Sequence, residues 1–274
     1  MLKIYHSKFG NISYYDMNSN SNNCLLLIHG LSCSKEIFHH LINNLCSNFR
    51  ILSIDLLGHG ESENSKNKKQ SYSISGFADS IIELLTDLKI KNLNIYGWSI
   101  GGNIALEILD KYNFIQNVIL DGYSPCSYIE KNFDKVFIFN EATPLIGKNN
   151  LTKNEAKFYV SNGGLKSNSF QNEFEVDKIV ENILRADGEM REYWYKSVMN
   201  LEGISPKECV EKHRKKIKIL IGEEDPGIQM NYLKENFDDI SIFLKNVGHA
   251  VFWDKPEEVK KIIYDFIFKI NVLL

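Results

Sequence analysis

Residues 94–106 read NIYGWSIGGNIAL, in which Ser99 stands among the glycines Gly97, Gly101 and Gly102. The apolar run before the serine has the composition of a buried strand, and IGGNIALEILDKY after it has helical periodicity. A glycine within regular structure costs roughly 0.5–1 kcal/mol relative to alanine. Glycines concentrated at this point therefore indicate a tight strand-to-helix turn that holds the serine in a strained conformation.

Short apolar runs that resemble the one before Ser99 recur along the chain. Such continuous runs are typical of strands buried on both faces of a parallel sheet. They read CLLLIHG (24–30), FRILSIDLLG (49–58), NLNIYG (92–97), NVILDG (117–122), KIKILIG (216–222) and DISIFLK (239–245). Helical patterns lie between them, so the alternation predicts a doubly wound, mostly parallel α/β sheet. The first sixteen residues alternate apolar and polar side chains around a turn at 8–11 and predict a hairpin.

The alternation stops between about residues 123 and 212. That stretch is rich in Phe, Tyr, Lys and Glu, carries helical patterns and lacks a buried strand run. We therefore expect an α/β core formed by residues 1–122 and 213–274, with a helical cap inserted at 123–212. The helices expected in the core lie at 35–48, 73–89, 100–112, near 227–237 and at 256–269.

Composition narrows the class of protein. The chain has 274 residues, 43% of them hydrophobic and 24% charged, which is an ordinary globular composition. Its net charge of -3 gives no global attraction to nucleic acid or to an anionic membrane. No stretch reaches the roughly 20 apolar residues of a membrane span, and no apolar signal segment opens the sequence. The five cysteines form no CxxC pair, which disfavours disulfides and structural zinc and favours a reducing, cytoplasmic setting: Cys24, Cys33, Cys46, Cys126 and Cys209.

A serine placed between a strand and a helix in a GxSxG turn has the context of a nucleophile elbow. Its hydroxyl attacks well only if a base takes its proton. His249, in NVGHAVFWDKPEEV, follows the last expected strand and precedes the last helix, so it lies at the same sheet edge as Ser99. We interpret the other six histidines as structural: His6, His29, His39, His40, His59 and His213.

The histidine needs a carboxylate that fixes its tautomer and stabilises its cation. The segment GEEDPGI (222–228) follows an expected strand, and Asp225 within it is the favoured acid. Asp121, at the end of an earlier strand on the same edge, is the alternative. The order Ser99, Asp225, His249 is the Ser…Asp…His order of α/β-hydrolases.

A tetrahedral oxyanion must be held by fixed hydrogen-bond donors. The backbone N–H of Ile100, directly after the serine, is one candidate. The second is expected from the loop after CLLLIHG, where Leu31 is favoured and Ser32 is the alternative.

Motifs spread over most of the chain resemble the α/β-hydrolase superfamily, in its capped single-domain branch. They are HGLS (29–32), DLLGHGES (55–62), GWSIGG (97–102), GEEDP (222–226) and GHAVFWDKPEEV (248–259). The resemblance implies an eight-stranded α/β-hydrolase sheet in which the insertion covers the active site. It also implies that DLLGHGES is a structural turn, so that His59 and Ser62 are not catalytic.

The segment GWSIGG is also similar to the nucleophile elbow of pimeloyl-acyl-carrier-protein methyl esterases. That likeness implies that Trp98 lines the acyl pocket, although packing beneath the cap explains this tryptophan equally well. The cap of that subfamily carries basic residues for the carrier protein, whereas charges of both signs are interspersed here. A serine at position 99 argues against the dehalogenases and epoxide hydrolases of the superfamily, which use aspartate.

The sequence thus predicts a serine hydrolase that cleaves a carboxylic ester or thioester of a small to medium acyl substrate. No GxGxxG, P-loop or HExxH motif is present, so neither a cofactor nor a metal is expected. The same triad also supports C–C bond hydrolysis, lyase chemistry and acyl transfer, and a non-catalytic ligand-binding relative is a further alternative. Residues expected at the substrate are Leu31, Trp98 and the cap aromatics Phe133, Phe137, Tyr193 and Trp194, although core packing of the cap explains the aromatics equally well.

Overall fold

The computed structural model describes residues 1–162 and 173–269 of the chain. Eight strands form one sheet with the spatial order β1-β2-β4-β3-β5-β6-β7-β8. In chain order they are β1 (Leu2–Ser7), β2 (Gly10–Met17), β3 (Cys24–Ile28), β4 (Arg50–Ile54), β5 (Leu93–Trp98), β6 (Ile115–Asp121), β7 (Ile217–Gly222) and β8 (Ser241–Leu244).

Six of these strands, from β4 to β8 in the spatial order, run parallel to one another. The hairpin of β1 and β2 joins the edge of the sheet antiparallel to β4. Every residue of β3 and β5 is buried, which explains why their sequences are continuous apolar runs instead of alternating ones. The doubly wound, mostly parallel eight-stranded sheet and the N-terminal hairpin are therefore confirmed.

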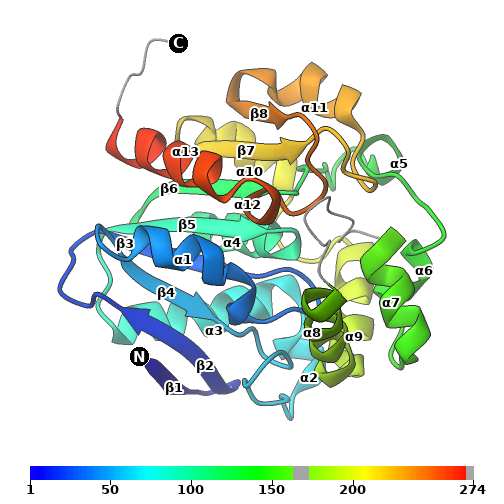
Figure 1. Ribbon diagram of the computed structural model, residues 1–274, viewed down its shortest axis with the longest axis horizontal. Helices are drawn as coiled ribbons and strands as arrows, with labels where there is room; N and C mark the ends of the chain where they lie inside the picture. The colour runs from blue at the N-terminus through cyan, green and yellow to red at the C-terminus, as the bar shows by residue number, and fades with distance from the viewer. Residues whose placement is uncertain (163–172, 270–274) are drawn as a thin grey trace.

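Helices cover both faces of the sheet. In chain order they are α1 (His39–Leu45), α2 (Lys68–Ser71), α3 (Ile74–Asp87), α4 (Ile100–Lys111), α5 (Phe133–Val136), α6 (Thr143–Ile146), α7 (Lys153–Asn162), α8 (Glu173–Arg185), α9 (Gly188–Met199), α10 (Pro206–His213), α11 (Met230–Phe237), α12 (Val251–Asp254) and α13 (Pro256–Phe268). In Figure 1, α1 and α13 lie in front of the sheet, and α3 and α4 lie behind it. Each face carries its own buried apolar cluster.

The helix expected at 35–48 begins later than predicted. Residues Lys35–Phe38 form a 3-10 turn, and α1 starts at His39. Lys35 is fully buried, with its backbone N–H and its ammonium group each 2.7 Å from a carboxylate oxygen of Asp55. This contact fixes both the backbone and the side chain of Lys35. The residues around it therefore form a 3-10 turn instead of the first turn of an α-helix.

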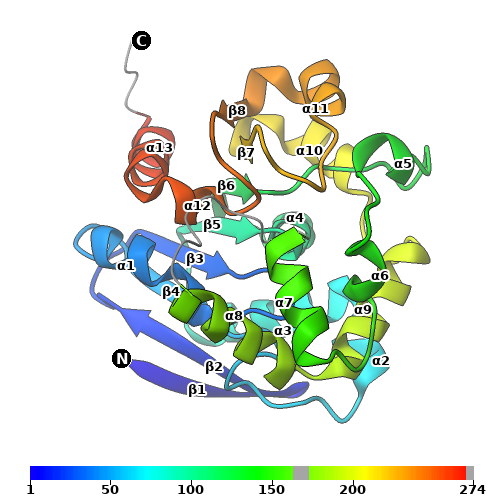
Figure 2. The ribbon, with the colours of Figure 1, turned by 45° about the vertical axis from the view of Figure 1, so that its right-hand side comes forward.

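Helices α6 to α9 lie beyond the carboxyl ends of the central strands (Figures 1 and 2). In open α/β sheets, ligands bind in the crevice at this edge. Helices α6 to α9 therefore lie over the edge of the sheet at which Ser99, Asp225 and His249 are expected. No helix within the described residues is both long and apolar enough to cross a membrane.

Candidate active site

Ser99 occupies a strained turn between β5 and α4. Its backbone angles are φ 56° and ψ -122°, a conformation that a residue with a side chain rarely adopts. Its N–H donates to the carbonyl of Asp121 at 2.8 Å. A Cβ atom on Gly97 would lie 2.3 Å from the carbonyl oxygen of Gly101, and one on Gly101 would lie 2.2 Å from that of Ile28. The glycines therefore allow the strand and the helix to approach closely enough for this turn to form.

His249 pairs with Asp225. The Nδ1 atom of the imidazole donates to Oδ2 of the carboxylate at 2.7 Å, and the N–H of Gly227 donates to Oδ1 at 2.9 Å. Both side chains are buried. Burial opposes the charged imidazolium, but the charge and the hydrogen bond of Asp225 outweigh it, so the pKa of His249 is raised above its ordinary value. This contact fixes the tautomer in which Nε2 is free to accept a proton.

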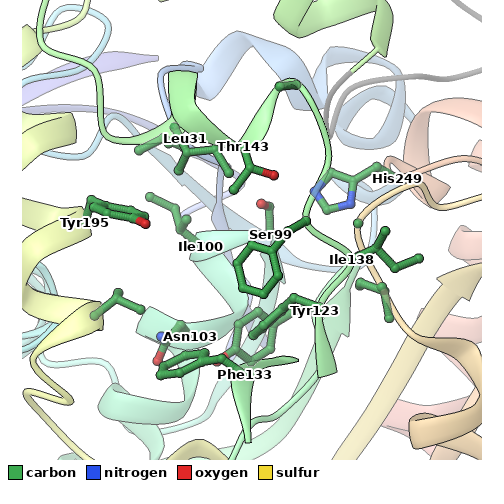
Figure 3. A pocket seen from close by; sticks show the side chains of 18 of the residues that line it. Leu31, Ser99, Ile100, Asn103, Tyr123, Phe133, Ile138, Thr143, Tyr195 and His249 are labelled. Atoms are coloured by element: carbon green, nitrogen blue, oxygen red, sulfur yellow. The ribbon is translucent and has the colours of Figure 1, made fainter. Parts of the chain in front are cut away.

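Ser99 and His249 border the same cavity, and Figure 3 shows both side chains at its wall. Within the described residues no direct hydrogen bond joins the Ser99 hydroxyl to the imidazole. In structures without substrate, catalytic hydrogen bonds are often long and tighten when the substrate binds. The structure thus brings the three residues Ser99, Asp225 and His249 to one site.

Two backbone N–H groups beside Ser99 are free to bind an anion. Neither Leu31 nor Ile100 donates its N–H to a protein acceptor in the part of the chain that the structure describes. Both residues are buried and both border the cavity. Ser32, the alternative donor, has a positive φ of 59°, and its hydroxyl accepts a hydrogen bond from Arg191 at 3.2 Å.

Asp121 has a different set of partners. Its carboxylate accepts hydrogen bonds from the Tyr96 hydroxyl and from the N–H groups of Val251 and Phe252, at 3.2 and 3.0 Å for the two amides. Complete burial raises its pKa to about 7, although these hydrogen bonds and the nearby His249 oppose the rise. The structure places Asp225 at the imidazole and places Asp121 at the start of α12, which directly follows His249.

Three residues of the histidine-glycine motifs have structural contacts. His29 donates from Nδ1 to the Gly30 carbonyl at 2.7 Å and accepts the Leu56 N–H at Nε2, at 3.1 Å. His59 is fully buried, and its Nδ1 lies 3.1 Å from the Leu57 carbonyl. The hydroxyl of Ser62 donates to the carbonyl of Asp55 at 2.8 Å. None of the three borders the cavity.

Trp98 does not border the cavity, in contrast to its expected place in the acyl pocket. Its indole N–H donates to the His249 carbonyl at 3.0 Å, and its ring centroid lies 5.4 Å from that of Phe252. Successive side chains of a strand point to opposite faces of the sheet. The side chain before Ser99 is therefore directed toward the face that α12 covers, where it supports the loop of His249.

The cavity is small and largely apolar. It has a volume of about 210 Å³, and no Lys, Arg, Asp or Glu among the described residues borders it. Of the cap aromatics expected here, Phe133, Phe137 and Trp194 border it, whereas Tyr193 does not. Six polar lining residues were not expected from the sequence: Asn103, Tyr123, Asn140, Thr143, Tyr159 and Tyr195.

Of these six, Asn103 alone carries a signal in the sequence, because it follows Ser99 by one helical turn. The others come from loop and cap segments whose course the sequence pattern does not specify. Candidate metal ligands lie elsewhere: within the described residues, three groups have ligand atoms within 4.8 Å of one another, and none borders the cavity. They are His39 with His40 and Glu175, Asp110 with Cys209 and His213, and Glu36 with Asp55 and Glu61.

Comparisons with known proteins agree with this fold. Over 98 residues the chain is 33% identical to an uncharacterized protein of Mycobacterium bovis, an alignment that covers 36% of this chain and 27% of that protein. Over 103 residues it is 31% identical to the pimeloyl-[acyl-carrier protein] methyl ester esterase of Yersinia pseudotuberculosis, covering 37% of each.

Among solved structures, the N-acyl homoserine lactonase AidH superposes with a TM-score of 0.88 at 23% identity. That match covers all of this chain and 98% of the lactonase. At this identity it supports the fold alone. A family model described as the alpha/beta hydrolase fold matches residues 23–256, which is most of the sequence. The chain therefore belongs to the α/β-hydrolase fold family.

Proposed function

We propose that this protein is a serine hydrolase that cleaves a carboxylic ester or thioester of a small to medium, uncharged acyl substrate. The observation that carries the proposal is His249, which is hydrogen-bonded to Asp225 and borders the same cavity as the strained Ser99. Two unpaired N–H groups, those of Leu31 and Ile100, flank that serine. In the proposed reaction these residues serve as the nucleophile, the base, the orienting acid and the oxyanion donors.

The first half of the reaction forms an acyl-enzyme. The Ser99 hydroxyl oxygen attacks the scissile carbonyl carbon while Nε2 of His249 takes the hydroxyl proton. The Asp225 carboxylate stabilises the imidazolium. The carbonyl oxygen becomes an oxyanion that accepts hydrogen bonds from Leu31 and Ile100. When the intermediate collapses, the bond to the alcohol or thiol breaks, and His249 returns the proton to that leaving group.

The second half hydrolyses the acyl-enzyme. Water attacks the Ser99 ester as His249 accepts one of its protons, and the second tetrahedral oxyanion uses the same two donors. Collapse then restores the serine and releases the carboxylic acid. Each bond formed to Ser99 in the first half is broken in the second, so no cofactor is consumed.

Several features support an ester of modest size. The cavity of about 210 Å³ has largely apolar walls, and in residues 1–162 and 173–269 no lysine or arginine borders it that could pair with an anionic substrate. Two similar proteins are named as a methyl ester esterase and a lactonase, so linear and cyclic esters both fall within the proposed class. We propose that residues 123–212 act as the cap, since Phe133, Phe137 and Trp194 of this segment border the cavity.

Initial rates on nitrophenyl esters from acetate to laurate test this proposal, with Ser99→Ala as the blank. We expect a chain-length optimum that is lost in the variant. Labelling with a serine-directed phosphonate, read by intact mass, should modify the wild type and not the variant. An unlabelled wild type would show that Ser99 is not an activated nucleophile and would overturn the proposal. Labelling without turnover of any ester would instead favour C–C cleavage or acyl transfer.

A further inference from the structure

Two of the three groups of candidate metal ligands among the described residues already contain a lysine ammonium group. The ammonium of Lys35 lies 2.7–3.0 Å from a carboxylate oxygen of every member of one group: Glu36, Asp55 and Glu61. In the second group, the carboxylate of Asp110 accepts a hydrogen bond from Lys212 at 2.7 Å. A metal ion would have to displace these ammonium groups, so neither group favours one.

The third group joins two helices from distant parts of the chain. His39 and His40 are the first two residues of α1, and Glu175 lies in the first turn of α8. In Figure 2 the start of α8 lies beside α1. One ligand atom of each residue lies within 4.8 Å of the others, and Nε2 of His40 is 3.9 Å from Oε1 of Glu175. Two ligand atoms on one tetrahedral zinc ion lie about 3.4 Å apart. A small rotation of the flexible Glu175 side chain therefore closes the gap.

The imidazole of His39 is in the form that binds a metal ion. Its Nδ1 donates to the carbonyl of Glu36 at 3.1 Å, so Nε2 carries the free lone pair. Histidines that bind metals almost always donate their other ring N–H in this way, which fixes the tautomer and the ring. Partial burial and the charge of the neighbouring His40 lower the pKa of His39, so the ring is neutral at neutral pH.

Trp253 holds both histidine rings in place. The two imidazole centroids lie 3.7 Å apart, and each is 5.5 Å from a ring of the buried Trp253. Packing of this kind limits the rotamers of both histidines before any ion binds, and a preorganised site loses less entropy on binding. Two of the three side chains are therefore already gathered at one point of the surface.

We propose that His39, His40 and Glu175 bind one zinc ion, which joins α1 of the sheet domain to α8 of the segment 123–212. Two imidazole nitrogens and one carboxylate oxygen are suitable ligands for zinc, and water completes the tetrahedron. Magnesium and calcium prefer oxygen ligands alone, so they do not fit this set. None of the three residues borders the cavity of Ser99, so the ion has a structural role that is independent of the proposed hydrolysis.

Calorimetric titration with zinc chloride tests the site, on untagged protein that has been treated with EDTA and dialysed. We expect one zinc ion per chain, and an affinity at least about tenfold lower in His39→Gln and in Glu175→Gln. His6→Gln is the matched control, because His6 is an exposed histidine that contacts Asn11 and belongs to none of the three groups. No uptake by the wild type, or uptake lost only in His213→Gln, would overturn the proposal.

Thermal unfolding tests whether the ion links the two helices. An ion that binds only the folded protein stabilises it, so saturating zinc should raise the Tm of the wild type by at least about 2 °C. The rise should disappear in Glu175→Gln, which leaves the ion with ligands on α1 alone. A rise that persists in this variant, or no rise in the wild type, would refute the link. Ser99→Ala should bind zinc as the wild type does, so a failure of the proposed hydrolysis leaves this test intact.

Discussion

The imidazole of His249 and the carboxylate of Asp225 meet at 2.7 Å although 24 residues separate them. Two glycines at strand ends make the approach possible. A Cβ on Gly222, the last residue of β7, would lie 2.2 Å from the carbonyl oxygen of Gly248, and one on Gly122 would lie 2.3 Å from that of His249. The loop of the histidine therefore packs directly against the backbone at the ends of β6 and β7.

Asp225→Asn should lower kcat on a nitrophenyl ester by about 10³–10⁴-fold, because the amide no longer stabilises the imidazolium and favours the wrong tautomer. Asp121→Asn is the matched comparison, since Asp121 contacts the loop of His249 and not its ring. We expect that change to lower kcat by less than about tenfold. The reverse ranking in steady-state assays would assign the acid to Asp121.

The pH profile should report the His249 base. His249 must be neutral to accept the Ser99 proton, so kcat/KM falls as the pH drops through its pKa. Because that pKa is raised above the ordinary value of 6.5, the midpoint of the acid limb should lie above 6.5. In Asp225→Asn burial acts without the opposing carboxylate, so the residual activity should show a lower midpoint. A midpoint that does not move would contradict this coupling.

The fold was predictable because its signals are local. Buried strands such as β3 and β5 are continuous apolar runs, and the glycines around Ser99 mark the turn that follows β5. The spatial proximity of Ser99, Asp225 and His249 followed from a general rule, since parallel strands place their carboxyl-terminal loops at one edge.

Other parts of the site were not predictable because they depend on tertiary packing. From the sequence, the Trp98 side chain could point either toward the active-site cavity or beneath the loop of His249. The direction depends on which face of the sheet this position of β5 presents, and the sequence does not specify that face. Likewise, Trp194 borders the cavity and its neighbour Tyr193 does not. The rotation of α9 about its own axis determines which of its side chains face the cavity. Helical periodicity in a region of mixed polarity does not specify that rotation.

Gly97→Ala should destabilise the fold strongly, because the new Cβ would lie 2.3 Å from the backbone oxygen of Gly101. Overpacking of this kind typically costs about 1–3 kcal/mol, and more where only backbone can move. Gly227→Ala is the matched control, since its nearest neighbour would be an Asp225 oxygen at an unstrained 3.6 Å. Equal urea midpoints for the two variants would refute the steric argument.

Asp121 should make stability depend on pH. Burial raises its folded pKa to about 7, against an ordinary value of 3.8. Between these values the folded protein keeps a proton that the unfolded chain has lost, so the free energy of unfolding falls as pH rises, by at most about 1.4 kcal/mol per pH unit. Asp121→Asn lacks this term. Urea unfolding at several pH values should show that the difference in unfolding free energy between the wild type and Asp121→Asn becomes smaller as the pH rises. A difference that stays constant with pH would contradict the prediction.

Arg191 should be required to hold the segment 123–212 against the loop that contains Leu31 and Ser32. Its buried guanidinium donates to the Ser32 hydroxyl at 3.2 Å and to three backbone carbonyls, at 2.5–3.1 Å: those of Lys148, Asn149 and Ile183. Arg191→Met leaves these acceptors unpaired, so we expect a loss of about 2–4 kcal/mol in unfolding free energy.

We also expect a lower kcat for Arg191→Met, because Ser32 adjoins the Leu31 donor. Arg191→Lys should recover little of either loss, since an ammonium group lacks the planar fork of donors that serves four acceptors at once. Urea unfolding and ester turnover measured on both variants check this expectation. Full recovery by lysine would mean that the positive charge, and not the hydrogen-bond geometry, accounts for the role of Arg191.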